Sequence, residues 1–324
     1  MFDVITVGET MAALAPGDGL PIRSATSYVK STAGAESNTA IGLAKLGMHV
    51  GWFSKLGDDE LGDFILHEVR GEGVDTSTVI RDGDHPTGLM LKQHATGLLS
   101  EPEVFYYRAG SAASTLAPSD LPEDYLKQAK VIHITGITPA LSASAKEMTD
   151  ELFKFAKANN IMVSFDPNIR LKLWSADQAR ETLLKYLYQA DIVMLGSEEA
   201  ELLLGTGDPD AVLANIKANG VAKYVAIKQG GKGAVVSDGT NVVSVPPVPV
   251  KVLDTVGAGD AFNAGFLYGV LNHLPIEECG EIAGLLGAAA VSAKGDTVGV
   301  PSGRHLARFI KHLKPGQYQN YVAR

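Results

Sequence analysis

The chain has 324 residues, of which 45% are hydrophobic, enough to bury the core of one large α/β domain or two small ones. Its 28 Lys and Arg residues are outnumbered by 37 Asp and Glu residues, and the net charge of −9 argues against sequence-independent binding to nucleic acids or anionic membranes. The single cysteine, Cys279, excludes an intrachain disulfide and favours a reducing compartment.

The sequence gives no sign of secretion or of membrane insertion. Its first residues, MFDVITVGETM, predict a strand rather than a basic leader with an apolar run, so the cytoplasm is the expected location. The longest run of small apolar residues, 283–293, is shorter than the roughly 18 residues that span a bilayer. We interpret this run as part of a buried helix.

Short β-rich runs separated by glycine dominate the first third of the chain. They lie at residues 3–7, 50–54, 87–93 and 104–108. One helix is expected to begin near Ser37 and to stop at Gly47, because Ala40, Leu43 and Ala44 recur at helical spacing.

Beyond residue 130, strand-like runs alternate with helical stretches. The runs VIHITG, IMVSFDP, DIVMLG and KYVAIK are rich in apolar residues, and the alternation predicts βαβ units with a mainly parallel sheet. Ligands of such sheets bind at the carboxyl ends of the strands. The candidate segments are therefore those that follow strands, at residues 166–170, 196–199, 229–233 and 254–260.

Two β-rich segments, at about 10–30 and 85–110, do not fit this alternation. We interpret them as a small sheet that covers the main body as a lid. Because no linker, repeat or low-complexity stretch divides the sequence, we expect one domain, residues 1–324, that carries the lid.

The stretch DTVGAGDAF, residues 254–262, carries the clearest chemistry. Gly257, Ala258 and Gly259 let the backbone approach a ligand and point its N–H groups into one concavity at a helix start, which suits a phosphate. Asp260 then either caps the helix or accepts the proton of a hydroxyl that attacks the bound phosphoryl group. The Walker motif, the third glycine of G-x-G-x-x-G, the protein-kinase H-R-D and H-E-x-x-H are all missing.

Two motifs resemble the signatures of the PfkB (ribokinase-like) carbohydrate kinases. DTVGAGDAFNAGF, residues 254–266, is similar to the C-terminal signature, and AGAESNTAIGLAKLG, residues 33–47, is similar to the N-terminal one. The resemblance extends over nearly the whole chain. It implies a three-layer αβα sandwich with a β-sheet lid, MgATP as the phosphoryl donor, Asp260 as the base, and Gly257 to Asp260 as the anion hole.

The resemblance also implies a nucleotide site. The segment AIKQGGKGA resembles the loop beside the nucleotide phosphates and ribose, although a plain tight turn would also explain its glycines. Glu199 matches the magnesium-holding glutamate of an Asn-x-x-Glu motif, but Gly196 replaces the asparagine, so a solvated acidic helix face stays an alternative. The implied nucleotide-binding residues are Asn168, Lys228, Gly230, Gly231, Gly233, Gly257 and Gly259.

The acceptor is predicted from the lid and the crevice. Tyr106 and Arg108 share one face of a strand, and Arg170 directly follows another strand, so both arginines are candidates to pair with a carboxylate unless they are solvated surface residues. The segments FYYRAGSAAS, AGAESN and SFDPNIR closely resemble family members that phosphorylate O6 of 2-keto-3-deoxygluconate. The implied sugar-binding residues are Gly34, Asn38, Tyr106, Arg108, Asn168, Arg170, Asp260 and Asp296.

Other acceptors and another class of protein stay open. Met90 stands where these kinases often have a tyrosine, and a fructokinase or related ketose kinase is the second choice. A phosphosugar acceptor is disfavoured because Lys92 is the only further cation near the proposed acceptor site. A non-catalytic sugar- or nucleotide-binding regulator would not need Asp260. The sequence leaves open a requirement for a monovalent cation and the formation of a homo-oligomer.

Overall fold

The computed structural model describes residues 1–93, 103–306 and 308, so residues 94–102 of the predicted lid segment lie outside the described residues. The helices are α1 (Ala35–Lys45), α2 (Glu60–Gly71), α3 (Glu123–Leu126), α4 (Ile137–Ala140), α5 (Ala143–Ala158), α6 (Ala176–Gln189), α7 (Ser197–Leu204), α8 (Pro209–Asn219), α9 (Ala258–Leu271) and α10 (Ile276–Val291). The strands are β1 (Phe2–Val7), β2 (Met11–Pro16), β3 (Tyr28–Ala33), β4 (Val50–Phe53), β5 (Lys55–Gly57), β6 (Ile80–Asp82), β7 (Leu89–Gln93), β8 (Glu103–Tyr107), β9 (Ala129–Thr135), β10 (Met162–Asp166), β11 (Ile192–Gly196), β12 (Tyr224–Lys228), β13 (Ala234–Ser237) and β14 (Val242–Val245). Short 3₁₀ helices lie at Ile22–Ser24, Ala112–Thr115, Pro118–Asp120 and Gly230–Lys232.

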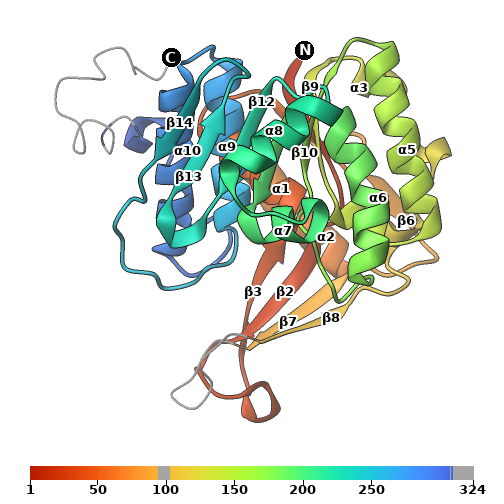
Figure 1. Cartoon of the computed structure of the whole chain (residues 1–324). Coiled ribbons are helices and arrows are strands. Elements are labelled where there is room, and N and C mark those ends of the chain that lie inside the picture. The colour runs from red at the N-terminus through yellow and green to blue at the C-terminus, as the bar shows by residue number, and fades with distance from the viewer. Residues whose placement is uncertain (94–102, 307, 309–324) are drawn as a thin grey trace.

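A large sheet lies at the centre of the molecule (Figure 1). Within the described residues it has eight strands, in the order β14-β13-β12-β11-β10-β9-β1-β4. The six strands from β12 to β4 run parallel, and the hairpin of β13 and β14 adds two antiparallel strands at one edge. The parallel strands place their carboxyl ends along one edge of the sheet, which is where a crevice is expected.

Helices cover both faces of this sheet, because successive strand residues point to opposite sides. On β1 and β9, Ile5 and Ile132 pack with α3, α5, α6, α7 and α8, whereas Val4 and Val131 pack with α1, α2, α9 and α10. The strands are apolar on both faces, as parallel strands between helical layers require. The predicted αβα sandwich with a mainly parallel sheet is therefore confirmed.

A second sheet projects from the carboxyl edge of the large one, at the bottom of Figure 1. Its order is β3-β2-β7-β8, with β2 and β7 parallel and the outer pairs antiparallel. Met11, Ala13, Ala33 and Met90 form a small apolar cluster on one face of it. The predicted small sheet is confirmed, although its strand β3 continues to Ala33, beyond the predicted limit near residue 30. A short parallel pair, β5 and β6, forms a separate two-stranded sheet.

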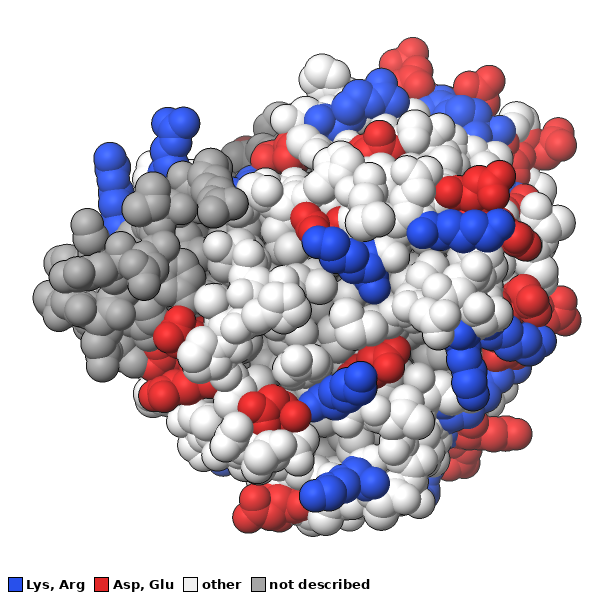
Figure 2. All heavy atoms as spheres, turned by 90° about the horizontal axis from the view of Figure 1, so that it is seen from above, with Lys and Arg blue, Asp and Glu red and all other residues white. Residues whose placement is uncertain are grey.

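The helix expected near Ser37 begins two residues earlier and ends at Lys45, before the turn at Gly47. The run 283–293 falls largely within the buried helix α10, which also holds the buried Cys279. No helix of the described part of the chain is long and apolar enough to cross a membrane. On the face seen from above in Figure 2, Lys and Arg side chains are interspersed with Asp and Glu and do not gather into one basic area.

Candidate active site

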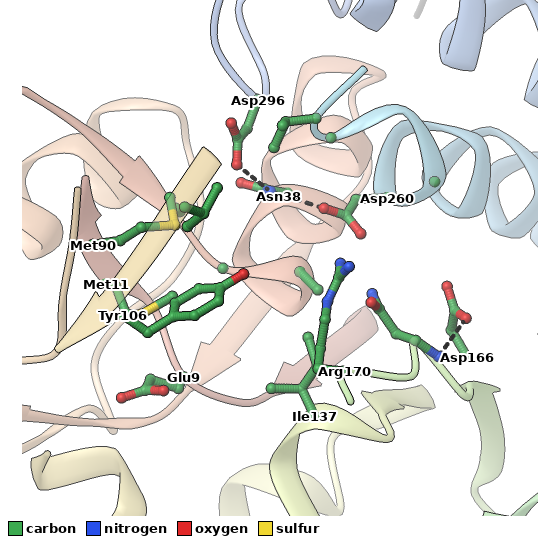
Figure 3. Close-up of a pocket in the computed structure, with 18 of the residues that line it drawn as sticks. Glu9, Met11, Asn38, Met90, Tyr106, Ile137, Asp166, Arg170, Asp260 and Asp296 are labelled. Atoms are coloured by element: carbon green, nitrogen blue, oxygen red, sulfur yellow. Dashed lines mark hydrogen bonds between the residues drawn. The ribbon is translucent and has the colours of Figure 1, made fainter. Parts of the chain in front are cut away.

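A pocket of about 420 Å³ lies between the carboxyl ends of the large sheet and the inner face of the second sheet (Figure 3). Its volume suits a small ligand. The sequence-predicted residues that line it are Gly34, Asn38, Tyr106, Arg108, Asn168, Arg170, Glu199, Lys228, Gly257, Gly259, Asp260 and Asp296. Residues from distant parts of the chain thus meet at the edge that the strand pattern indicates.

Four predicted residues do not line this pocket: Ala258, Gly230, Gly231 and Gly233. The three glycines lie in the turn between β12 and β13. Gly233 has φ +96°, and a Cβ there would come within 2.1 Å of the Val245 carbonyl oxygen. The tight turn therefore explains the glycine at position 233, and this is the alternative that the sequence left open. The explanation does not depend on what else the loop contacts.

The start of α9 forms one wall of the pocket. Gly257 is the N-cap and has φ +78°, a left-handed conformation that side chains rarely adopt. Within the described part of the chain, no acceptor is found for the backbone N–H groups of residues 257–260, while Gly257 O accepts the first bond of the helix, from Ala261 N. The unbonded N–H groups and the helix dipole make this wall suitable for an anion.

Asp260 lies in the first turn of α9 and is only 8% exposed. The Nδ2 group of Asn38 donates to Asp260 Oδ2 at 2.8 Å and to Asp296 Oδ2 at 3.3 Å, so one amide links the two acids (Figure 3). Burial raises the pKa of Asp260 to about 7, with a further contribution from the neighbouring acids Asp166 and Asp296, and the Asn38 bond opposes the shift. Burial likewise raises the pKa of Asp296. A carboxyl with such a pKa is suited to accept a proton near neutrality.

Arg108 lines the pocket but already has an ionic partner. Its Nε donates to Glu9 Oε2 at 2.7 Å, Nη2 contacts the same oxygen, and Ser111 Oγ donates to Glu9 Oε1 at 2.5 Å. Glu9 and Arg108 are 2% and 8% exposed. Glu9 therefore balances the charge of Arg108 in this structure, and a contact between Arg108 and a substrate carboxylate stays a prediction.

Arg170 is different. It follows β10, is exposed, and points into the pocket toward Asp260 (Figure 3). Among the described residues its guanidinium forms no ion pair, and its charge opposes the rise that burial causes in the pKa of Asp260 and of Asp296. Arg170 is therefore the arginine of the predicted pair that is available to an anionic ligand.

A buried polar cluster lies beneath the anion-binding wall. Lys228 Nζ donates to Asp166 Oδ2 at 2.7 Å, and Asn263 Nδ2 of α9 donates to the same oxygen at 2.6 Å. Burial lowers the pKa of Lys228, but the carboxylates of Asp166 and Glu199 outweigh it and raise that pKa overall. Lys228 thus stays charged, and the cluster fixes the first turns of α9 to the end of β10.

Glu199 also lines the pocket, but both of its carboxylate oxygens are in use. Oε1 accepts from Ile169 N at 2.8 Å and Oε2 from Gly196 N at 2.7 Å, and burial raises its pKa. Gly196, which replaces the expected asparagine, thus contacts Glu199 through its backbone N–H group. Within residues 1–93, 103–306 and 308, no group of three or more His, Cys, Asp or Glu side chains is placed to hold a metal ion.

One side of the pocket is made by the second sheet. Tyr106 and Met90 are register partners on β8 and β7, so the methionine lies next to the tyrosine on the inner face. The Tyr106 ring projects into the pocket (Figure 3). Across the pocket, Asn168 has φ +36° and its N–H donates to Asp166 Oδ1 at 3.1 Å, which turns the chain after β10 toward the ligand space.

Sequence reasoning missed Glu9 of the pocket, named Lys92 without its ion-pair partner, and placed Asp166 in the candidate segment 166–170 without giving it a role. Glu9 comes two residues after β1, so the carboxyl-end rule would have found it had it been applied to the first strand. Asp166 is the last residue of β10. Lys92 gives no local signal of its partner, which lies 162 residues away.

Comparison with known proteins agrees with this geometry. The family model of the pfkB family carbohydrate kinases matches residues 1–303, and the chain belongs to this family. It is a carbohydrate kinase. It is similar to a 2-dehydro-3-deoxygluconokinase of Bacillus subtilis (strain 168), with 41% identity over 98% of this chain and 99% of the relative.

Two solved structures support the fold. A PfkB protein from Polaromonas sp. JS666 is 36% identical, with a TM-score of 0.86 over 94% of this chain and 99% of that one. An uncharacterized sugar kinase from Pyrococcus horikoshii, solved in complex with ATP, is 27% identical, with a TM-score of 0.82 over 94% of this chain and 97% of that one.

Proposed function

We propose that the protein transfers the γ-phosphate of ATP to O6 of 2-keto-3-deoxygluconate. The observation that carries the proposal is the position of Asp260, which shares one pocket with the unbonded N–H groups at the start of α9. A base and an anion hole in one pocket are what phosphoryl transfer to an alcohol needs. The name of the Bacillus subtilis relative supports the choice of acceptor.

In the proposed reaction, Asp260 takes the proton of the O6 hydroxyl. As the O6–phosphorus bond forms, the bond between the γ-phosphorus and the β,γ-bridging oxygen breaks, and ADP leaves with that electron pair. The N–H groups of residues 257–260 hold the oxygens of the migrating phosphoryl group. Asn38 holds Oδ2 of Asp260 and thereby fixes the carboxylate toward the acceptor.

ATP is the proposed donor, and the Pyrococcus horikoshii structure with ATP supports it. Lys228 would face the phosphates from beside Gly259, since a Cβ built at Gly259 would lie 3.7 Å from Lys228 Nζ. The backbone of Gly230, Gly231 and Gly233 would run along the nucleotide. Because both Glu199 oxygens accept backbone N–H groups, Mg²⁺ would be held by phosphate oxygens and water beside Glu199, in line with its preference for keeping water ligands. The ion would neutralise charge on the phosphates.

The acceptor would lie against the second sheet, which we propose acts as a lid of the same domain and keeps water from competing as the acceptor. Arg170 would bind the carboxylate of the sugar acid. Arg108, held by Glu9, would donate with Tyr106 to oxygens of the keto end. The sugar hydroxyls would contact Asn38, Asp296, Asn168 and the backbone at Gly34.

The proposal is tested by measuring coupled ADP release over 2-keto-3-deoxygluconate, fructose, ribose and tagatose. We expect the sugar acid to give the highest kcat/KM. A preference for fructose would replace the proposal with a ketose kinase. ATP binding without turnover on any of the four sugars would instead indicate a binding protein that does not catalyse.

Replacing Arg170 with Met is expected to raise KM for 2-keto-3-deoxygluconate at least about tenfold and to change KM for fructose much less, since a charged hydrogen bond is lost only with the acid. Arg108→Met should weaken both sugars, because its charge is already balanced by Glu9. Steady-state kinetics should be run well above pH 7, since loss of Arg170 also raises the pKa of Asp260. Arg180→Met, an exposed residue of α6 outside the pocket, is the control. Equal losses for both sugars in Arg170→Met would contradict a carboxylate contact.

A further inference from the structure

A buried ion pair joins the second sheet to the segment that leads into α9. Lys92 Nζ of β7 lies 2.5 Å from Asp254 Oδ2, and the two side chains are 7% and 6% exposed. Burying two charges costs free energy that their attraction offsets only when the pair is well arranged, so such a pair is not expected merely to add stability. Its position between two parts of the pocket calls for an explanation.

Asp254 shapes the turn that precedes the anion-binding wall. Its Oδ1 accepts from Val256 N at 3.2 Å, and its own N–H donates to Val291 O at the end of α10, at 3.3 Å. Gly257, the left-handed N-cap of α9, follows three residues later and packs against the backbone of Asp296. The carboxylate that Lys92 holds therefore helps to set where the N–H groups of residues 257–260 point.

Among the other contacts of the second sheet, two that involve basic residues do not reach that turn. Lys172 Nζ donates to the Val104 carbonyl oxygen of β8 at 2.8 Å, in an exposed position. Arg108 pairs with Glu9, which follows β1. Of these three basic residues, Lys92 is the one that connects the second sheet to the turn before α9. The charge of Lys92 also opposes the rise that burial causes in the pKa of Asp296, another residue of the pocket.

We propose that Lys92 is a positioning residue that, through Asp254, couples the placement of the second sheet over the acceptor to the arrangement of the anion hole. The inference deepens the proposed function and rests on it. Binding of the sugar acid would fix the position of the second sheet, and Lys92 would then hold Asp254 in place. The anion hole formed by the N–H groups of residues 257–260 would thereby fit the ATP phosphates better. Because such coupling is reciprocal, ATP must tighten the sugar acid by the same factor.

The experiment measures the Kd of the β,γ-methylene analogue of ATP with and without saturating 2-keto-3-deoxygluconate. We expect the sugar acid to tighten the analogue at least about fivefold in the wild-type protein, within the usual range of coupling between sites. In Lys92→Met the factor should fall to about one, and Lys92→Arg should restore most of it. Lys172→Met is the matched control: it loosens the sheet elsewhere, so it should weaken the sugar acid while keeping the coupling factor.

If Lys92 had only a structural role, its substitution would weaken the binding of both the sugar acid and the ATP analogue and leave the coupling factor unchanged. Undiminished coupling in Lys92→Met, or no coupling in the wild type, overturns the inference. If Lys92→Met does not fold, the double variant Lys92→Met with Asp254→Asn removes both buried charges, and it should fold without coupling. Failure of the proposed function is separate, because it shows as an absence of sugar phosphorylation by the wild-type protein.

Discussion

Asp260→Asn is expected to lower kcat at least about a hundredfold, the low end for loss of a positioned base, while binding of the ATP analogue persists. Asparagine keeps the size of the side chain and can still accept from Asn38 Nδ2, so the pocket should keep its shape. What it lacks is the ability to take the proton of the attacking hydroxyl. Steady-state kinetics and equilibrium binding of the β,γ-methylene analogue separate the two effects.

The matched control is Asp296→Asn, because both acids bind the same amide of Asn38. Loss of a hydroxyl contact at Asp296 should raise KM for the sugar more than it lowers kcat. An Asp260→Asn variant with wild-type kcat would remove Asp260 from the mechanism, and equal kcat losses in both variants would leave the base unidentified.

The pH dependence follows from the same carboxyl. A base works only when ionised, and burial raises the pKa of Asp260 to about 7, so kcat/KM of the wild type should rise as the pH increases through 7. A raised carboxyl pKa also means that the folded state holds a proton that the unfolded chain loses near 3.8, so this group destabilises the fold as the pH rises from about 4 to 7. The penalty above pH 7 is about 4 kcal/mol. Asp260→Asn removes it, and its Tm well above pH 7 should exceed that of the wild type.

The elements of the large sheet could be predicted because each parallel strand is a short apolar run, buried on both faces, that ends beside a polar residue. This local pattern placed β9 to β12 within two residues of their observed ends. The carboxyl-end rule then brought Asn168, Glu199 and Asp260 to one edge, and the pocket contains all three. Strand β3 was covered only in part by the predicted lid segment, which stops near residue 30, because its residues are largely exposed and give no apolar period.

The ion pairs of the pocket could not be predicted, because no local pattern records a partner that is distant in the sequence. Glu9 and Arg108 are 99 residues apart, and Lys92 and Asp254 are 162 apart. Without Glu9, Arg108 looks like a cation that needs an anionic ligand. With Glu9, the pair is neutral, and the preference for an acid rests on Arg170.

Gly257→Ala is the second change with a large expected effect. Alanine at φ +78° is strained, and its Cβ would come within 2.2 Å of the Asp296 carbonyl oxygen, a backbone atom that cannot simply move aside. The start of α9 must therefore shift, and its N–H groups leave the positions from which we propose that they hold the phosphoryl group. We expect kcat to fall about 10²- to 10³-fold, as for loss of an oxyanion-hole donor, with a lower Tm. Steady-state kinetics and thermal unfolding measure the two effects.

The Gly47→Ala variant separates the effect of backbone strain at a positive φ from the effect of displacing the start of α9. Gly47 has φ +88°, but a Cβ at this position would have no neighbouring atom within 4 Å, and the residue lies in the turn after α1, outside the pocket. The variant should lose stability through strain alone, about 1–2 kcal/mol, and keep kcat. Gly259→Ala places a Cβ on the pocket wall that the start of α9 forms. Because this Cβ would make only an ordinary contact, 3.7 Å from Lys228 Nζ, the fold should tolerate the change. If Gly257→Ala matched Gly47→Ala in both stability and kcat, displacing the N–H groups at the start of α9 would have no effect on the reaction. The start of α9 would then not be where the transferred phosphoryl group is held.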